Sequence, residues 1–221
     1  MNESLFFLHV LVIFGFAVAA IKLGKEALTA WVSLQAVLAN LFVIKQISFF
    51  GFNVTCSDAF AIGSILGLNL LQEYFGRPAA VRALKICLFC MVFFVVMAQF
   101  HLFYEASIFD SAHIAYETIL SASPRLLFAS MTVFFFVQQV DVRIFSWLKK
   151  KHSKLLFRNG ISLTLSQLLD TSLFSFLGLW GIADSLCDII VVSFLIKLLI
   201  IALLSPVTAV SKRWIQPAEA A

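Results

Sequence analysis

Apolar runs about long enough to cross a bilayer as a helix (~20 residues) recur along the chain, each bounded by a short polar stretch. Irregular backbone cannot face lipid, so each run that spans must be helical. The runs predict helices at residues 4–23, 27–48, 57–75, 82–104, 118–146, 160–181 and 186–211. We therefore expect an all-α, polytopic integral membrane helix bundle with about seven transmembrane helices. It would occupy residues 1–221 as a single transmembrane domain.

The composition supports this class and argues against several others. The chain is 62% hydrophobic and 13% charged, whereas soluble domains are about 45–50% apolar and about 25% charged. Basic residues do not cluster with aromatic ones on a soluble face, so we expect no nucleic-acid partner. Cys87 and Cys90 form a lone CxxC, and no HExxH, GxSxG or phosphate-loop motif occurs. We therefore expect no metal, no cofactor and no enzymatic activity.

The basic residues predict the orientation of the chain. Thirteen of the 16 Lys and Arg fall on one side of the membrane when all seven helices span. They are Lys22, Lys25, Arg77, Arg82, Lys85, Arg143, Lys149, Lys150, Lys151, Lys154, Arg158, Lys212 and Arg213. Basic residues concentrate in short cytoplasmic loops, so we expect the N-terminus outside and the C-terminus in the cytoplasm. The first residues are acidic, which favours a retained first helix over a cleaved signal.

The third span carries a polar stripe. Its members are Asn69, Gln72, Glu73 and Gly76. Their i, i+3, i+4, i+7 spacing puts them on one helix face, which must point into the bundle or a water-filled cavity. The same span carries a row of small residues that would let a neighbouring helix approach closely, namely Ala59, Gly63 and Gly67. We favour a functional role for the three polar side chains and a packing role for the glycines.

Ionisable residues also occur within later spans, where they are costly and by default mark a pathway or a binding site. Asp170 lies about midway along the sixth span and Lys197 near the middle of the seventh. A buried ion pair between them is the structural alternative to a functional role. Asp141 lies closer to the cytoplasmic end of the fifth span, where a bond to Arg143 is the alternative. The amides that accompany these groups are Asn40, Gln138 and Gln167.

At these same residues the chain resembles the queuosine precursor transporter (vitamin uptake transporter) family. The matching stretches are residues 39–45, 68–77, 138–145 and 166–174, together with Lys197, and they cover residues 27 to 205. The resemblance implies a six-helix core at 27–211, similar to the substrate-binding components of energy-coupling-factor vitamin importers. The helix at 4–23 looks like an addition to that core. Asn69 departs from the family pattern, because many members carry Asp there.

The resemblance implies import of 7-deazaguanine bases, either queuosine precursors or queuine, across a bacterial inner membrane for tRNA queuosine salvage. A carboxylate accepts two adjacent N–H donors, so Asp170 and Glu73 are expected to bind the base edge. Tyr74 would stack on the flat ring. Gln72, Gln167 and Asn40 are expected to complete the hydrogen bonds of the base. Asp141 and Lys197 are expected to act in gating or coupling. Asn69 and Gln138 are expected to lie on the substrate pathway.

Two other functions stay open from the sequence. One is import of another vitamin-like solute, and the other is a non-transporting membrane scaffold or an intramembrane enzyme. Proton coupling, facilitated transport and an energy-coupling partner are equally compatible with the residues, as are a monomer and a homo-oligomer.

Overall fold

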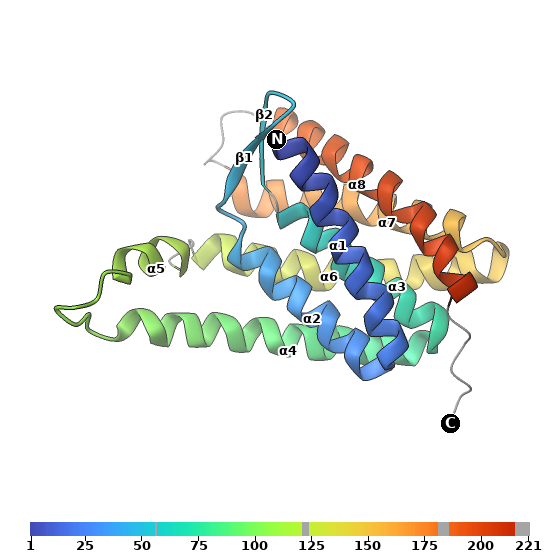
Figure 1. Ribbon diagram of the computed structural model, residues 1–221, viewed down its shortest axis with the longest axis horizontal. Helices are drawn as coiled ribbons and strands as arrows, with labels where there is room; N and C mark the ends of the chain where they lie inside the picture. Colours follow the sequence, from blue (N-terminus) through green and yellow to red (C-terminus); the bar gives the residue numbers. More distant parts are fainter. Residues whose placement is uncertain (56, 121–123, 181–185, 215–221) are drawn as a thin grey trace.

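The chain folds as a bundle of long helices with one β-hairpin at its edge (Figure 1). The computed structural model describes residues 1–55, 57–120, 124–180 and 186–214. The elements are α1 (Asn2–Leu23), α2 (Lys25–Leu41), β1 (Gln46–Phe49), β2 (Phe52–Thr55), α3 (Ser57–Tyr74), α4 (Gly76–Phe103), α5 (His113–Leu120), α6 (Pro124–Lys151), α7 (Leu155–Phe174), the π-helical turn η1 (Ser175–Leu179) and α8 (Leu186–Trp214).

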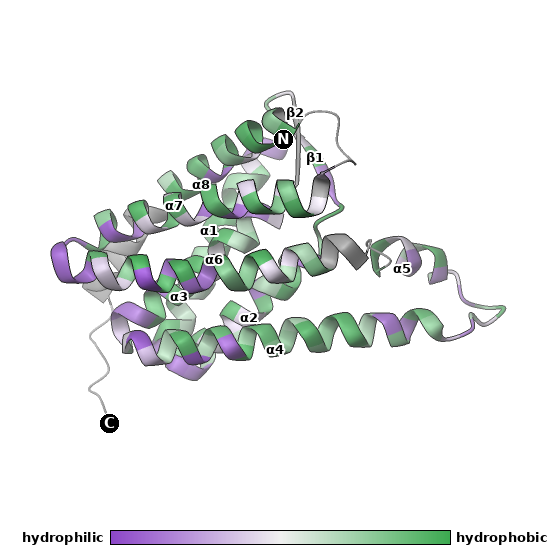
Figure 2. Cartoon of the chain, turned by 180° about the vertical axis from the view of Figure 1, so that it is seen from behind, coloured by the Kyte–Doolittle hydropathy of each residue, from purple (hydrophilic) through white to green (hydrophobic). Residues whose placement is uncertain are grey.

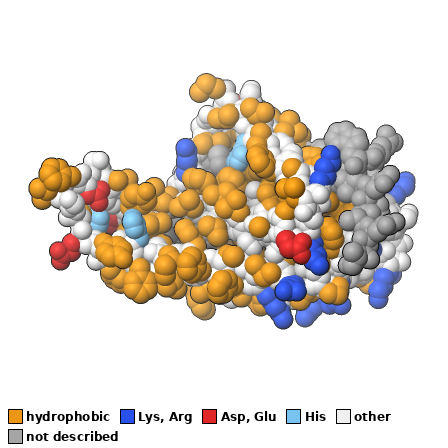
Figure 3. Space-filling model, turned by 60° about the horizontal axis from the view of Figure 1, so that its bottom comes forward, with side chains coloured by type: hydrophobic (Ala, Val, Ile, Leu, Met, Phe, Trp, Pro, Cys, Tyr) orange, Lys and Arg blue, Asp and Glu red, His pale blue; other side chains and the backbone are white. Residues whose placement is uncertain are grey.

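The outer helices have the length and the surface of membrane spans. Within the described residues, three helices are long and apolar enough to cross a membrane, namely Asn2–Leu23, Gly76–Phe103 and Phe128–Lys151. Their outward faces expose large apolar side chains such as Leu8, Phe16, Phe89 and Phe93. Hydrophobic residues run along these helices in Figure 2 and cover most of the face seen in Figure 3. Such surfaces are typical of contact with lipid, so the expected polytopic membrane bundle is confirmed.

The polar helix α3 lies at the centre of the bundle. It is in contact with α1, α2, α4, α6, α7 and α8, and 14 of its 18 residues are buried. A helix enclosed on all sides needs no lipid-facing apolar surface, because neighbouring helices take the place of the hydrocarbon. This explains why α3 can hold Asn69, Gln72 and Glu73 although its hydropathy is modest.

The glycines of α3 let two helices approach it closely, as their spacing predicted. A Cβ atom on Gly67 would meet Cγ2 of Val32 and would lie 2.9 Å from the Trp31 ring of α2. A Cβ atom on Gly63 would lie 2.9 Å from Oε1 of Gln35 on α2 and 3.1 Å from the Ile13 side chain of α1. The absence of side chains at these two positions therefore sets the distance between α3 and its neighbours.

The predicted second helix, 27–48, is wrong at its C-terminal end. The helix stops at Leu41, and the following residues form the antiparallel β1–β2 hairpin, in which Phe49 pairs with Phe52. The two residues between these strands, Phe50 and Gly51, both have positive φ (47° and 84°), as a two-residue hairpin turn requires. Phe49 is buried against Phe6 of α1, with ring centroids 4.8 Å apart. The apolar run therefore continues as a packed strand, not as a helix.

Two further boundaries differ from the prediction. The predicted helix 118–146 is divided into the short helix α5 and the long helix α6, which begins at Pro124, a residue suited to the first helical position. Gly76 was predicted to extend the polar stripe of the third span. It instead stands at the junction of α3 and α4 with φ of 84°, a conformation that side chains disfavour.

The two ends of the bundle differ in charge. The α1–α2, α3–α4 and α6–α7 junctions lie together on the right in Figure 1, and we call this the basic end because it carries Lys25, Arg77 and the Lys149–Lys151 run. The hairpin and α5 lie at the opposite side, which we call the hairpin end. Basic side chains gather towards one end of the molecule in Figure 3.

Replacing Gly67 by Ala should destabilise the protein, because the added methyl group would overlap Val32 and Trp31. Overpacking of this kind costs about 1–3 kcal/mol. The matched control is Gly15→Ala in α1, where no atom lies within 4 Å of the new methyl group; removing that helical glycine should stabilise by up to about 1 kcal/mol. Thermal unfolding of the purified protein in detergent measures both, and equal melting temperatures for the two variants would contradict this packing.

Candidate functional site

The basic end is closed by an ion cluster on three helices. Glu73 at the end of α3 accepts a hydrogen bond from Arg158 of α7 at 2.8 Å, and Lys149 of α6 lies 3.2 Å from its other carboxylate oxygen. Lys149 also donates to the backbone carbonyls of Gln72 and Glu73, where a cation is favourable at a helix C-terminus. We call Glu73, Arg158 and Lys149 the basic-end triad; its formal charge is +1.

Asp141 lies in the middle of the bundle and is fully buried. Its Oδ1 accepts hydrogen bonds from Ser162 at 2.6 Å and Ser166 at 2.7 Å, both on α7. Its other oxygen, Oδ2, has no hydrogen-bond partner among the described residues. The bond to Arg143 considered from the sequence is not formed, because the Arg143 side chain is exposed whereas Asp141 is fully buried. Asp141 therefore presents one carboxylate oxygen held by protein hydroxyls and one that is not.

A second ion cluster lies nearer the hairpin end. Lys197 of α8 donates a hydrogen bond to Asp170 of α7 at 2.9 Å, so the ion pair considered from the sequence is present. The same ammonium lies 3.6 Å from Asp58 in the first turn of α3. We call Asp58, Lys197 and Asp170 the hairpin-end triad; its formal charge is −1.

The three groups follow one another along the bundle. On α7, Arg158, Ser162, Ser166 and Asp170 recur every four residues and share one face. From Arg158 to Asp170 the helix rises by about 18 Å at 1.5 Å per residue. Glu73 and Asp170 therefore lie at opposite ends of this polar face. The sequence-based expectation that both bind the same base edge does not fit this geometry, and we revise it below.

Four buried primary amides have no hydrogen-bond partner among the described residues. Asn159 of α7 lies beside Arg158 in the basic-end triad, and the other three lie between the two triads. These three are Asn69 of α3, Gln138 of α6 and Gln167 of α7; both polar atoms of each amide lack a hydrogen-bond partner among the described residues. Buried polar groups are paired in more than about 90% of cases in native proteins, so three such side chains in one region are unusual. We call these three residues the central amide cluster.

The contacts between helices place these amides at a similar depth. The Gln72 amide donates to the Val142 carbonyl at 3.2 Å and to the Ser146 hydroxyl at 2.6 Å, which aligns α3 with α6. Both helices run towards the basic end, so Asn69 and Gln138 each lie about one turn nearer the hairpin end than these contacts. Gln167 follows Ser166, which is bonded to Asp141. Since α3, α6 and α7 contact one another pairwise, we infer that the three amides lie in one polar layer.

Three other predicted site residues lie outside this layer. Gln72 is tied to α6 by the two hydrogen bonds just described. Asn40 is half-buried, accepts a hydrogen bond from Ser130 of α6 at 2.9 Å, and belongs to the hairpin-end part of α2. Tyr74 is the last residue of α3, beside the basic-end triad. These positions favour a structural role for Gln72 and Asn40. Tyr74 lies at the basic end of the buried polar groups.

Several residues of the site were not predicted. Asp58 follows Ser57 at the start of α3, where an acidic residue in a first turn is common and draws no attention. Arg158 and Lys149 were counted as loop charges, but Arg158 is buried within α7. The signal that could have found Arg158 and Ser162 is the four-residue spacing to Ser166 and Asp170 along one helix face.

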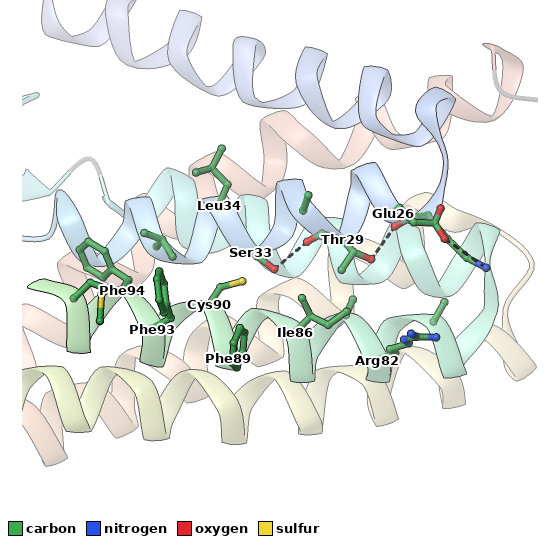
Figure 4. Close-up of a pocket in the computed structure, with 16 residues that line it drawn as sticks. Glu26, Thr29, Ser33, Leu34, Arg82, Ile86, Phe89, Cys90, Phe93 and Phe94 are labelled. Carbon is green, nitrogen blue, oxygen red and sulfur yellow. Dashed lines mark hydrogen bonds and ion pairs between the residues drawn. The ribbon is translucent and has the colours of Figure 1, made fainter.

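A surface groove lies elsewhere on the protein. It has a volume of about 790 Å³ and runs between α2 and α4. Figure 4 shows apolar side chains such as Ile86, Phe89 and Phe93 along it, with Glu26 and Arg82 at its basic end. Thr29 and Ser33 also line it, but their hydroxyls donate to backbone carbonyls of α2, and the remaining lining is largely apolar. Recognition of a polar solute requires convergent polar groups instead. We therefore place the candidate site in the buried polar layers. Within the described residues, no group of three or more His, Cys, Asp or Glu side chains converges as a metal site would require.

The helices that face lipid thus enclose a column of buried polar groups, which runs from the basic-end triad through Asp141 and the central amide cluster to the hairpin-end triad. We call it the polar column. A bundle that encloses such a column, closed at both ends, is the architecture of a small-solute membrane transporter. The chain belongs to the family described as "putative vitamin uptake transporter", whose model matches residues 59–211. It is also 29% identical over 197 residues to the "probable queuosine precursor transporter" of Bacillus subtilis (strain 168), covering 87% of this chain and 86% of that protein. No solved structure matches the chain.

Replacing Glu73 by Gln should destabilise the protein, because Arg158 would keep its buried charge without a carboxylate partner. Removing one partner of a buried ion pair costs about 3–5 kcal/mol. The control is Glu26→Gln, which removes the exposed pair with Lys25 and should change stability by less than about 1 kcal/mol. Adding Arg158→Met to Glu73→Gln should restore part of the loss. If Glu73→Gln unfolds at the wild-type temperature, the buried pair described here is contradicted.

Proposed function

We propose that this protein imports a 7-deazaguanine base, either a queuosine precursor or queuine, across the bacterial inner membrane and acts as a transporter without catalysing a reaction. The observation that carries the proposal is the central amide cluster. Asn69, Gln138 and Gln167 are completely buried, yet their amides bond to nothing in the described part of the protein. A ligand that offers both donors and acceptors would satisfy them.

The chemistry of a deazaguanine base suits this layer. Its pairing edge presents adjacent N–H donors beside a carbonyl acceptor, and each primary amide supplies two donors and one acceptor oxygen. The Oδ2 atom of Asp141, three residues from Gln138 on α6, adds a carboxylate acceptor without a hydrogen-bond partner among the described residues. Hydrogen bonds to a charged acceptor are about twice as strong as those between neutral groups. We therefore move the carboxylate role in base binding from Asp170 and Glu73 to Asp141.

Glu73 and Asp170 take a different role in this proposal. Each belongs to an ion cluster that joins α7 to α3, one at each end of the polar column. A solute in the central layer must pass one of these clusters on entry and the other on exit. The proposed role of the two triads is to close the column on either side of the bound base, with Tyr74 beside the path at the basic end.

The relative in Bacillus subtilis supports the choice of substrate, because its name refers to a queuosine precursor and the similarity extends over 87% of the chain. The family description, which refers to vitamin uptake, favours a second candidate: import of another vitamin-like solute with the same donor and acceptor pattern. Binding measurements with deazaguanines and with vitamins of similar size distinguish the two.

We also propose an orientation. The basic end carries Lys25, Arg77 and Lys149–Lys151, and such residues concentrate on the cytoplasmic side. The hairpin end would then face outward, with the N-terminus, and the C-terminus would lie in the cytoplasm. Solute would enter past the hairpin-end triad and leave past the basic-end triad.

Cells that cannot synthesise queuosine should recover queuosine in their tRNA when they express this chain and receive a labelled deazaguanine. The measurement is the queuosine content of tRNA with and without the chain, for precursor and queuine separately. Cells with an empty vector are the control. Absence of recovery, with the protein shown to be in the membrane, would exclude these substrates and leave the vitamin-like alternative.

Replacing Gln138 or Gln167 by Met should abolish uptake and leave stability unchanged or raised. Each amide lacks a partner in the described structure, so an apolar side chain of similar size costs nothing in folding. Gln72→Met is the matched control, because it removes the hydrogen bonds to Val142 and Ser146 and should lower stability by about 1–3 kcal/mol. The queuosine assay and thermal unfolding measure the two effects. Normal uptake by both Met variants would exclude the central layer as the binding site.

A further inference from the structure

We propose that the hairpin-end triad is the binding site for a proton that drives import. The proposal rests on the proposed function, since the proton would be carried with the deazaguanine base. Proton binding would supply the energy for import, where the sequence alone is equally compatible with proton coupling, facilitated transport and an energy-coupling partner.

The charge of the triad is the first argument. Asp58, Lys197 and Asp170 carry two negative charges and one positive charge, and their side chains are 13%, 6% and 23% exposed. One ammonium neutralises one carboxylate, and the second carboxylate leaves a net charge of −1 at membrane depth. An uncompensated buried charge is costly. One proton on either carboxylate oxygen makes the triad neutral, and its release restores the charge.

The geometry of the triad is the second argument. The ammonium of Lys197 lies 2.9 Å from Asp170 and 3.6 Å from Asp58. The second distance is too long for a strong hydrogen bond, so one carboxylate is held less tightly than the other. A proton shared between the two carboxylates would decide which of them holds Lys197. Because Asp58 and Asp170 belong to different helices, that choice changes the contact of α8 with α3 and α7.

The same helices carry the proposed binding layer. Asp170 is three residues from Gln167 on α7, on the same face, and Asp58 shares α3 with Asn69. A change in how Lys197 joins α3 to α7 therefore reaches two of the three amides of the central cluster. This connection allows proton binding and base binding to favour each other, as coupled transport requires.

The other ionisable groups near these helices suit the role less well. The basic-end triad already has a charge of +1, which opposes the addition of a proton. Asp141 is held by two hydroxyl groups and belongs to the base site. His9 of α1 is half-buried and its ring packs against Phe60 of α3 with centroids 4.8 Å apart, not against a carboxylate. A metal cation is disfavoured at the hairpin-end triad because the ammonium of Lys197 already occupies the space between the carboxylates.

The test uses the full-length protein in liposomes with a labelled deazaguanine, and it compares two modes of transport. In the first, base exchanges for base at equal pH on both sides. In the second, an imposed pH gradient drives accumulation. One pH unit is worth about 1.4 kcal/mol, so one proton per base allows up to about tenfold accumulation. The wild type should show both modes.

Asp58→Asn should lose the accumulation, because the variant triad is neutral without a proton, and the exchange that remains should no longer depend on pH. Asp58→Glu, which keeps the carboxylate, should retain both modes. Two matched controls should also retain both: Asp110→Asn, an exposed residue at the same end whose side chain caps α5, and His9→Gln. Asp110→Asn makes the same chemical change outside the triad.

Three results would overturn the proposal. The first is wild-type exchange without any response to the pH gradient, and the second is full gradient-driven accumulation by Asp58→Asn. The third is accumulation driven by a sodium gradient alone. Absence of exchange by the wild type with every deazaguanine would refute the proposed substrate itself, and the coupling proposal with it. The exchange mode therefore separates the two failures.

Discussion

The enclosure of α3 is the constraint on which the rest of the structure depends. A helix that carries Asn69, Gln72 and Glu73 can cross a bilayer only when other helices cover it, because lipid offers no hydrogen-bond partners. The glycines at 63 and 67 bring α2 and α1 against α3 closely enough to exclude lipid. The helices that are long and apolar enough to span, α1, α4 and most of α6, then take positions with outward faces. The polar centre and the apolar surface of the bundle thus both follow from the need to separate α3 from lipid.

The buried charges are harder to explain as contributions to stability. A buried ion pair is often no more stabilising than a pair of apolar side chains of the same size, because both ions must lose their water. Here two such clusters occur, with Asp141 between them, and all three groups contact the same face of α7. The free-energy cost of burying these charges is better explained by the central amide cluster that lies between the two ion clusters. Two ion clusters that can separate in turn would open the central amide cluster to one side or to the other.

The sequence predicted more of the fold than of the site. Long apolar runs determine where helices occur, so the helices were found, apart from the segment that forms the β-hairpin and the division of one predicted helix into α5 and α6. That segment, including Phe49, is as apolar as the helix before it, and its strand conformation depends on packing against Phe6 of α1. In the site, the Asp170–Lys197 pair was considered because both residues stand out in apolar runs. Asp58 and Arg158 were missed because each lies near a predicted helix end, where charges are ordinary.

The separation of Glu73 from Asp170 could also have been predicted from the sequence. Glu73 falls at the end of the third predicted span and Asp170 lies well inside the sixth. Adjacent spans run in opposite directions, so the depth of each residue follows from its distance to the nearest charged loop. The pairwise contacts between helices do not follow from such counting. They required the structure, and they are what separates the partnered amide of Gln72 from the unpartnered ones of Asn69, Gln138 and Gln167.

The N-terminal helix shows how the same constraint applies outside the region that the family model matches, residues 59–211. Helix α1 buries one stripe of side chains that includes Val10, Ile13 and Ala17, and it contacts α2, α3 and α8. Ile13 lies where a Cβ atom on Gly63 would be 3.1 Å from it, so α1 covers part of the glycine row of α3. Its opposite face exposes Leu8 and other apolar side chains. Helix α1 is therefore one of the helices that separate α3 from lipid, and it is a structural part of the bundle around the polar column.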